Sequence, residues 1–192
     1  RLERLIDRES RALIEAMAAD FGHRAEHECE TYDIIASLSD IRENLRHLAA
    51  WMKPRRYPVR SYMLPGRARV EPTPLGVVGV VSPWNFPLYL AISPAASALA
   101  AGNRVLLKPR ELTPRTSALL ARAIDGAFAR EELAVFEGGP QVAERFCALP
   151  FDHLLYTGST RVGRLIAMAC AKGRRTTAAT IAPRIGLFCK MC

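Results

Sequence analysis

From Gly76 onward, short apolar runs alternate with longer segments that favour helices, and this alternation limits the possible fold more than any other feature of the sequence. The apolar runs are GVVGVV (76–81), RVLLK (104–108), AVFE (134–137) and HLLYT (153–157). Such short runs suit strands that are buried on both faces, because these strands need no polar side. The β-α-β-α-β-α-β-α order predicts an α/β fold with a doubly wound parallel sheet.

The connecting segments carry helix signals. We predict helices over 88–101, 114–129, 141–147 and 160–171. Gly102-Asn103 ends the first of them, and Thr113-Pro114 begins the second, with Thr113 as the N-cap and Pro114 in the first helical position. After Lys172 no periodicity is visible, and residues 173–192 stay without an assigned element.

The first part of the chain has a different hydrophobic pattern. Apolar residues recur at helical spacing over 2–19 and again over 31–52, which predicts two amphipathic helices. Two short segments, 59–63 and 67–71, flank Leu64-Pro65-Gly66 and are typical of a β-hairpin.

Composition excludes several classes of protein. The net charge is +8, but the arginines are spread along the chain without an aromatic-interleaved basic patch, so we expect no nucleic-acid partner. No stretch of about 18 apolar residues is present, so we expect no membrane span. The five cysteines have irregular spacing, which favours free thiols in the cytoplasm over a disulfide framework or a metal site.

Several polar residues lie directly after predicted strands. Asn85 follows the first strand, Lys108 and Glu111 close the second, and Gly158 and Ser159 follow the fourth. Ligands of open parallel sheets bind at the carboxyl ends of the strands, so these residues are expected to meet at one edge.

Each group suggests a part of a nucleotide site. TGSTRVG (157–163) predicts a glycine turn and a helix start, where free N–H groups suit a pyrophosphate; an ordinary capped helix is the alternative. In KPRE (108–111), Lys108 and Glu111 can hold the hydroxyls of a ribose; a solvated surface ion pair is the alternative.

Asn85 stands in SPWNFP, between Trp84 and Phe86 and between two prolines. A rigid amide can donate an N–H to an oxyanion that develops in acyl chemistry, without reorganisation in the transition state. A simple turn asparagine is the alternative. The number of constraints around this one amide favours a functional role.

Three long motifs, VVSPWNFPL, ALAAGNRVLLKPRELTP and FDHLLYTGSTRVGR, together resemble the aldehyde dehydrogenase superfamily in order and spacing. DFGHR (20–24) and WMKPRR (51–56) are most similar to its coniferyl aldehyde dehydrogenase branch. The resemblance covers about residues 1–172. It implies an incomplete, Rossmann-like NAD-binding domain over 1–172, with 59–71 as part of an oligomerisation arm and a homodimeric parent protein, and it leaves 173–192 as a divergent tail.

The resemblance also implies NAD(P)-dependent oxidation of an aldehyde, and an aromatic one in the coniferyl branch. Asn85 would be the oxyanion donor. The residues expected at the cofactor are Pro83, Trp84, Lys108, Glu111, Gly158, Ser159 and Val162. Glu111 is expected to repel a 2′-phosphate, which favours NAD and leaves NADP open.

Departures from the family pattern limit what these residues can do alone. The family's general-base glutamate, expected in an E-L-G-G-K motif soon after Lys172, is absent, and its nucleophilic cysteine lies beyond the last residue. Arg110 replaces the small residue usual between proline and glutamate. We therefore expect an inactive N-terminal part of a dehydrogenase; the alternative is a non-catalytic dinucleotide-binding fragment.

Overall fold

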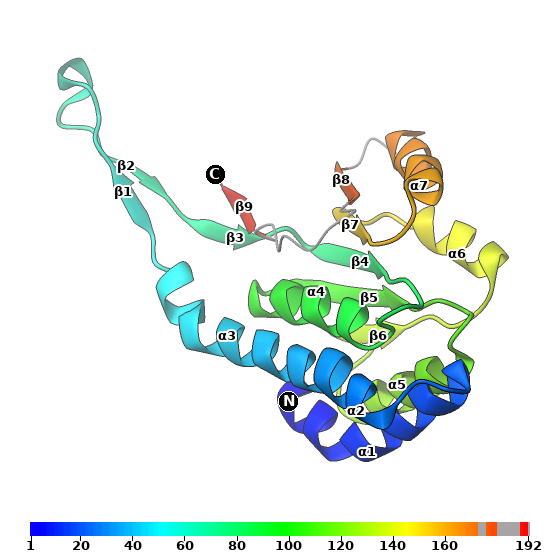
Figure 1. The fold of residues 1–192 in the computed structure, drawn as a ribbon. Helices are drawn as coiled ribbons and strands as arrows, with labels where there is room; N and C mark the ends of the chain where they lie inside the picture. Colours follow the sequence, from blue (N-terminus) through cyan, green and yellow to red (C-terminus); the bar gives the residue numbers. More distant parts are fainter. Residues whose placement is uncertain (173–175, 180–188, 192) are drawn as a thin grey trace.

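A five-stranded parallel sheet forms the centre of the computed structural model, which describes residues 1–172, 176–179 and 189–191 (Figure 1). The strand order is β6-β5-β4-β7-β8, and all four neighbouring pairs are parallel. The strands are β4 (Val77–Val81), β5 (Arg104–Lys108), β6 (Leu133–Val135), β7 (His153–Tyr156) and β8 (Thr176–Ala179). The predicted doubly wound sheet is confirmed, and β8 adds a strand in the tail that the sequence left unassigned.

Helices cover both faces of this sheet. One face carries α4 (Tyr89–Ala100) and α5 (Pro114–Asp125), and the other carries α6 (Pro140–Cys147) and α7 (Thr160–Lys172). Side chains alternate along each strand, so that Val78 and Val80 enter the core under α4 and α5 while Val81 enters the core under α6 and α7. Strand β4 is thus apolar on both sides, as its sequence predicts.

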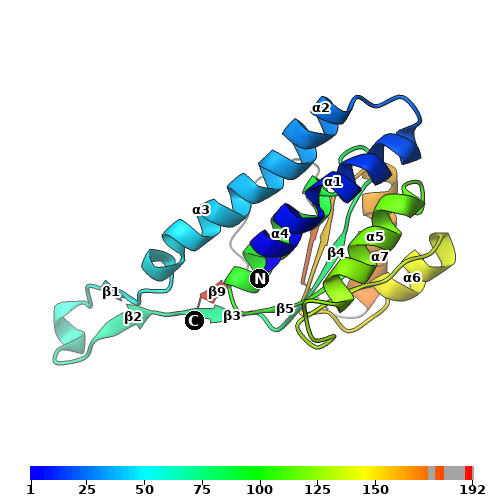
Figure 2. The ribbon, with the colours of Figure 1, turned by 90° about the horizontal axis from the view of Figure 1, so that it is seen from below.

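One further layer, made of two helices, lies outside α4 and α5. Helix α1 (Leu2–Phe21) packs on α5, and the long second helix packs on α4 (Figure 2). This second helix runs through α2 (Glu26–Cys29), a π-helical segment (Glu30–Ile35) and α3 (Ala36–Trp51). Both N-terminal helices were predicted, but the second begins before the predicted residue 31, and its π-helical segment has no counterpart in the sequence pattern.

A two-stranded arm projects from the body of the molecule (Figure 1). It consists of β1 (Arg55–Tyr57) paired antiparallel with β2 (Ala68–Val70), and a 3-10 turn (Ser61–Met63) lies at its tip. The predicted hairpin exists, but the prediction of a strand over 59–63 is wrong. Pro58, which has no N–H to give to a ladder, follows β1 directly, and the chain enters the turn instead.

A short strand joins the arm to the sheet. This strand, β3 (Pro72–Pro74), pairs antiparallel with β9 (Cys189–Met191) from the tail. Neither strand was predicted, because the prolines of β3 argue against a strand and the tail has no alternating pattern. Within the ranges that the structure covers, no helix is both long and apolar enough to cross a bilayer.

The start of α5 is held by a residue from α1. Thr113 occupies the N-cap position, but its hydroxyl does not cap the helix and instead lies 3.4 Å from the carbonyl oxygen of Arg110. The carboxylate of Asp20 accepts the N–H groups of Arg115 and Thr116 at 3.1 and 2.8 Å. Asp20 therefore takes the role that the sequence assigned to the Thr113 side chain, because the Thr113 hydroxyl is turned to the Arg110 carbonyl and the first N–H groups of the helix have no partner within it.

Candidate functional site

The chain changes its winding direction at β4, the first strand of the parallel sheet in chain order. Strand β5 lies on one side of β4 and β7 on the other, so the loops that leave β4 and β7 open toward each other. Ser82 donates its N–H to the Lys108 carbonyl at 3.2 Å, and Thr157 donates its N–H to the Val81 carbonyl at 3.1 Å. These bonds extend the ladder past the strands and hold both loops at the crevice, where open α/β sheets bind ligands.

A cavity of about 110 Å³ lies in this crevice. Its lining residues come from the loops after β4, β5 and β7 and from the first turn of α7: Ser82, Pro83, Trp84, Arg110, Tyr156, Thr157, Gly158, Ser159 and Val162. Five of these nine were predicted from the sequence as cofactor residues. Ser82, Arg110, Tyr156 and Thr157 were not. Ser82, Arg110 and Thr157 are each adjacent in sequence to a predicted residue, and Tyr156 lies two residues before Gly158.

Gly158 makes the turn into α7 possible. A Cβ atom at this position would lie 2.2 Å from the Tyr156 hydroxyl oxygen and 2.6 Å from its Cζ. The Tyr156 ring is 3% exposed and cannot move aside, and its hydroxyl donates to the Ser159 carbonyl at 3.3 Å. The turn therefore wraps around a buried ring, and only glycine lets the backbone come this close.

Replacing Gly158 with alanine is expected to lower the free energy of unfolding by about 1–3 kcal/mol, as for other overpacked sites. The measurement is equilibrium unfolding in urea. Gly163→Ala is the matched control, since its Cβ would meet the same ring at an ordinary 3.4 Å from within α7. That variant is expected to gain about 0.5–1 kcal/mol from helix propensity. Equal effects at the two positions would contradict the role given to Gly158.

Lys108 is buried and does not line the cavity. Its side chain is 2% exposed, and Nζ donates to the Pro109 carbonyl at 2.7 Å. Burial lowers the pKa of Lys108, and the nearby Glu111 carboxylate opposes this shift. The alternative of a solvated surface ion pair is therefore excluded, because the ammonium is enclosed and Glu111 instead lies 3.5 Å from Nε of Arg110.

Asn85 lies on the loop between β4 and α4, directly after Trp84. The residue is exposed, and its side-chain amide makes no hydrogen bond with any residue in the described part of the chain. Its backbone carbonyl accepts a hydrogen bond of 3.1 Å from Nη1 of Arg24. The backbone is thus anchored while the amide is left free, which is the arrangement that a donor to a bound ligand needs.

The anchor of this loop is a buried ion pair between Arg24 and Asp33. An Nη2–Oδ2 distance of 3.0 Å joins them, and their side chains are 6% and 0% exposed. The guanidinium also lies over the rings of Phe21 and Phe86, at 5.0 and 5.1 Å from their centroids. An ion pair taken out of water is costly unless further contacts satisfy it, and these rings and the Asn85 carbonyl supply some of them.

Asp33 also connects the second helix to the beginning of α4, through its other carboxylate oxygen. Its Oδ1 accepts the N–H groups of Leu88 and Tyr89, at 3.1 and 3.0 Å, at the beginning of α4. Burial raises the pKa of Asp33, against the opposing effect of these N–H groups and of Arg24. The Arg24–Asp33 pair therefore holds the loop after β4 at two points, at Asn85 in its middle and at its end where α4 begins.

The Arg24–Asp33 pair was not predicted from the sequence. One signal was available: Asp33 directly precedes Ile34 on the apolar stripe of the second helix, where a charged residue needs a partner. The partner could not be read from the pattern, because the contact from Arg24 to Asn85 spans 61 residues.

The described cysteines are packing residues. Cys29, Cys147 and Cys170 are free and buried. Burial raises the pKa of Cys147 to about 11 and also raises the pKa of Cys29. Thiols of this kind stay protonated at neutral pH and are poor nucleophiles. The side chains of the Cys189–Cys192 motif lie outside the described residues.

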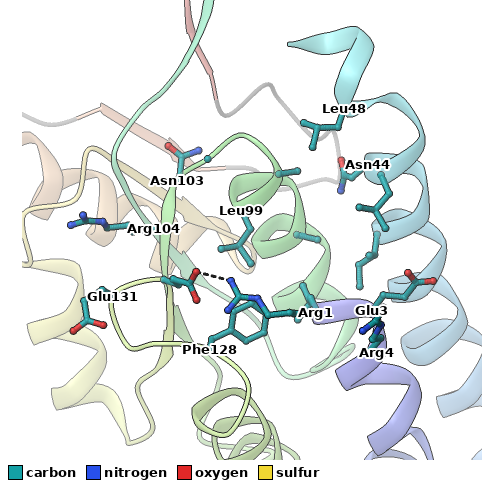
Figure 3. A pocket seen from close by; sticks show the side chains of 17 residues that line it. Arg1, Glu3, Arg4, Asn44, Leu48, Leu99, Asn103, Arg104, Phe128 and Glu131 are labelled. Carbon is teal, nitrogen blue, oxygen red and sulfur yellow. Dashed lines mark hydrogen bonds and ion pairs between the residues drawn. The ribbon is translucent and has the colours of Figure 1, made fainter.

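A larger cavity, of about 830 Å³, lies at the opposite end of the sheet (Figure 3). It opens between α1, α3, α4 and the start of β5, and an ion pair of 2.6 Å between Arg1 and Glu132 crosses it. This is the amino end of the strands, away from the crevice, and none of the predicted site residues lines it.

The crevice has the features of a dinucleotide site. Two buried polar atoms there, Oγ of Ser82 and Nε of Arg110, have no hydrogen-bond partner among the residues that the structure describes. Buried polar atoms are normally satisfied, so this pair marks a place for a polar ligand. The first turn of α7 supplies free N–H groups beside them, and Gly158 keeps the approach open. The residues present therefore fit a phosphate-bearing cofactor such as NAD or NADP.

Comparison with known proteins agrees with this assignment. The family model described as "Aldehyde dehydrogenase family" matches residues 1–181. A coniferyl aldehyde dehydrogenase from a Pseudomonas species is 48% identical over 161 residues, which are 83% of this chain and 33% of that protein. The chain thus spans about a third of the length of this relative.

Solved structures show the same fold. AldH of Staphylococcus aureus in a substrate-bound state superposes with a TM-score of 0.88 at 28% identity, over 92% of this chain and 38% of that one. An NAD-dependent benzaldehyde dehydrogenase from Corynebacterium glutamicum superposes with a TM-score of 0.78, also at 28% identity, over 93% of this chain and 39% of that one.

Proposed function

Because this chain belongs to the aldehyde dehydrogenase family, we propose that it forms the dinucleotide-binding part of an enzyme that oxidises an aldehyde to a carboxylic acid. The observation that carries the proposal is the convergence of Pro83, Trp84, Gly158, Ser159 and Val162 on one cavity at the carboxyl ends of β4 and β7. When bound, a nicotinamide dinucleotide would accept the hydride that leaves the aldehyde carbon.

The residues of the crevice divide the work of binding. The N–H groups at the start of α7 and the Ser159 hydroxyl would hold the pyrophosphate, and the exposed face of Trp84 would lie beside the cofactor. Lys108 and Glu111 would hold the adenosine ribose, which requires the Lys108 ammonium to leave the Pro109 carbonyl. This binding orients the cofactor toward the loop that carries Asn85.

Asn85 would act on the substrate. When a cysteine thiolate adds to the aldehyde carbon, the carbonyl oxygen becomes an anion, and the Asn85 amide would donate an N–H to it. Once the hydride has left this carbon, the adduct is a thioester, and water activated by a general base adds to its carbonyl carbon and expels the cysteine thiolate. We propose that this cysteine and this base are not among the 192 residues, since Cys29 and Cys147 are buried thiols with raised pKa values.

An aromatic aldehyde of the coniferyl type is the proposed substrate. The support is the name of the relative that is 48% identical, together with the benzaldehyde dehydrogenase among the structural neighbours. We further propose that the arm pairs with a second copy of the chain, because Tyr62 and Leu64 at its tip are 79% and 66% exposed. Large apolar side chains so exposed are typical of an interface.

Titration with NAD⁺ tests the proposed site. Trp51 is replaced by phenylalanine, so that Trp84 is the single remaining tryptophan, and its fluorescence is followed as NAD⁺ is added. A saturable change is expected, because Trp84 lines the cavity. The Gly158→Ala variant, in which the turn is displaced, should lose the signal. The absence of a saturable change in the unaltered site would contradict the proposal.

A non-catalytic dinucleotide-binding fragment, the alternative, would also bind NAD⁺. It differs from the proposed function in that it belongs to no aldehyde-oxidising enzyme. The purified chain is mixed with NAD⁺ and coniferyl aldehyde, and NADH is followed by its absorbance. No NADH is expected from the chain alone, whereas aldehyde-dependent NADH formation would contradict the proposal that the nucleophile lies elsewhere.

A further inference from the structure

The arm carries more than half of the net charge of the chain. Residues 53–71 contain six basic residues and one acidic residue, a net charge of +5, whereas the whole chain has +8. Arginines occur along the entire sequence, but acidic residues are almost absent from this segment, so its charge is not offset. The basic residues of the arm are Lys53, Arg55, Arg56, Arg60, Arg67 and Arg69, and all of them are exposed.

The two strands of the arm place like charges opposite each other. Arg56 of β1 and Arg69 of β2 are direct partners in the antiparallel pair, so both side chains project from the same face. Glu71 lies 2.8 Å from Arg69, whereas Arg56 has no ion pair with any described residue. Like charges opposite each other destabilise a strand pair, and an anion held against them removes the repulsion. Neighbouring guanidinium groups also present planar forks of donors that match phosphate oxygens.

The tip of the arm, residues 61–64, is apolar. Tyr62, Met63 and Leu64 are 79%, 54% and 66% exposed. The N–H groups of Met63 and Leu64 donate to the carbonyls of Arg60 and Ser61 at 2.9 and 3.1 Å, so the turn satisfies these groups itself. Such a turn can leave bulk water at low cost, because unsatisfied backbone groups are what make entry into an apolar medium expensive.

We propose that the arm docks on an anionic lipid bilayer, with its tip between the headgroups and the acyl chains and its arginines on the headgroup phosphates. The arm projects away from the body of the molecule, so the tip can reach a flat surface first (Figure 1). A tyrosine is favoured at this depth because its ring is apolar and its hydroxyl stays wet. Each basic residue close to an anionic membrane surface strengthens binding about fivefold.

This partner accounts for both parts of the arm. Apolar contact with a second copy, as proposed above, would cover the tip but leave the cations behind it without a counter-charge, and the two partners would compete for the tip. A single-stranded nucleic acid would use the cations and the tyrosines but not Met63 and Leu64, because it binds through phosphates and stacked bases. The inference does not depend on the dinucleotide site.

The test is co-sedimentation of the purified chain with vesicles. Binding is expected to equimolar phosphatidylcholine and phosphatidylserine but not to phosphatidylcholine alone, and it should weaken as salt is added. Arg56→Gln/Arg69→Gln should lower the affinity about 25-fold. Arg115→Gln/Arg122→Gln is the matched control, because it removes the same charge from exposed positions on α5, at the far end of the molecule from the arm (Figures 1 and 2). The control should lose less than about threefold.

A reporter at the tip tests the depth of docking. Tyr62→Trp in a Trp51→Phe/Trp84→Phe background carries a single tryptophan, whose emission should shift to the blue on anionic vesicles and be quenched by lipids with brominated acyl chains. Leu64→Ser should weaken binding about tenfold through lost apolar burial.

Four results would overturn the proposal. The first is no binding to anionic vesicles, and the second is an equal loss in the α5 control, which would point to net charge alone. The third is a blue shift without vesicles that grows with protein concentration, which would assign the tip to a second copy. The fourth is tight binding of a single-stranded oligonucleotide that Leu64→Ser leaves unchanged, without binding to vesicles.

Discussion

Replacing Asp33 with alanine is expected to lower the free energy of unfolding by about 3–5 kcal/mol, the usual cost of removing one partner from a buried ion pair. The change leaves the Arg24 guanidinium, whose side chain is 6% exposed, without its buried counter-charge. It also leaves the N–H groups of Leu88 and Tyr89 without their acceptor. Equilibrium unfolding in guanidinium chloride, followed by far-UV circular dichroism, measures the loss.

Glu28→Ala is the matched control for this experiment. Glu28 is also an acidic partner of Arg24, but the distance is 3.8 Å and the Glu28 side chain is 50% exposed. An exposed pair of this kind contributes less than about 1 kcal/mol. The double variant Arg24→Met/Asp33→Asn should recover part of the loss, since no unpaired charge then remains and the amide oxygen can still accept the two N–H groups. A loss below 1 kcal/mol for Asp33→Ala would show that the pair does not hold the loop.

Replacing Lys108 with methionine is expected to separate stability from binding. The free energy of unfolding should stay the same or rise, because methionine fills the buried site without the cost of an enclosed ammonium. NAD⁺ affinity should fall about ten- to a hundredfold through loss of one charged hydrogen bond. Trp84 fluorescence and urea unfolding measure the two quantities, and Lys53→Met, at an exposed position, should change neither. An unchanged affinity would remove Lys108 from the ribose site.

The pH dependence of unfolding offers an independent check on Lys108. Burial lowers its folded-state pKa below the ordinary 10.5. At pH values between the pKa of Lys108 in the folded chain and that in the unfolded chain, the unfolded chain binds more protons. The free energy of unfolding therefore rises as the pH increases through this window, and it is lower at neutral pH. The Lys108→Met variant should lack this rise. An identical profile in both proteins would show that the ammonium has no cost in the folded state.

Much of the fold was predictable, because parallel strands that are covered on both faces appear in the sequence as short apolar runs. The run RVLLK coincides with β5. The burial of Lys108 could also be predicted from this pattern, because Lys108 shares a strand face with Leu106, and helix α6 must cover that face. The family resemblance added Trp84, and of the residues to which the rule that ligands bind at strand carboxyl ends was applied, Gly158 and Ser159 line the cavity whereas Asn85, Lys108 and Glu111 do not. Local pattern and topology were sufficient for Gly158 and Ser159.

Contacts between distant segments were not predictable. Asp20 holds the start of α5 across 96 residues, and Arg24 holds the Asn85 carbonyl across 61. Neither contact leaves a periodic trace, because a single polar side chain can turn toward any neighbour that the tertiary fold supplies. The same reason explains Arg110: the sequence marked it as unusual, but whether it faced the cavity or the solvent depended on the loop's path.

The stretch from Asp20 to Asp33 contacts both the start of α5 and the loop after β4, and this has a consequence for how the protein would lose its function. Gly22 and His23, between the two anchor points, are exposed and accessible to a protease. A single cut there would sever Asp20 from Arg24 while leaving every strand of the sheet intact. Ligand binding would then be lost before the bulk secondary structure. The integrity of the outermost helices, far from any reacting atom, would therefore determine how long the molecule stays functional.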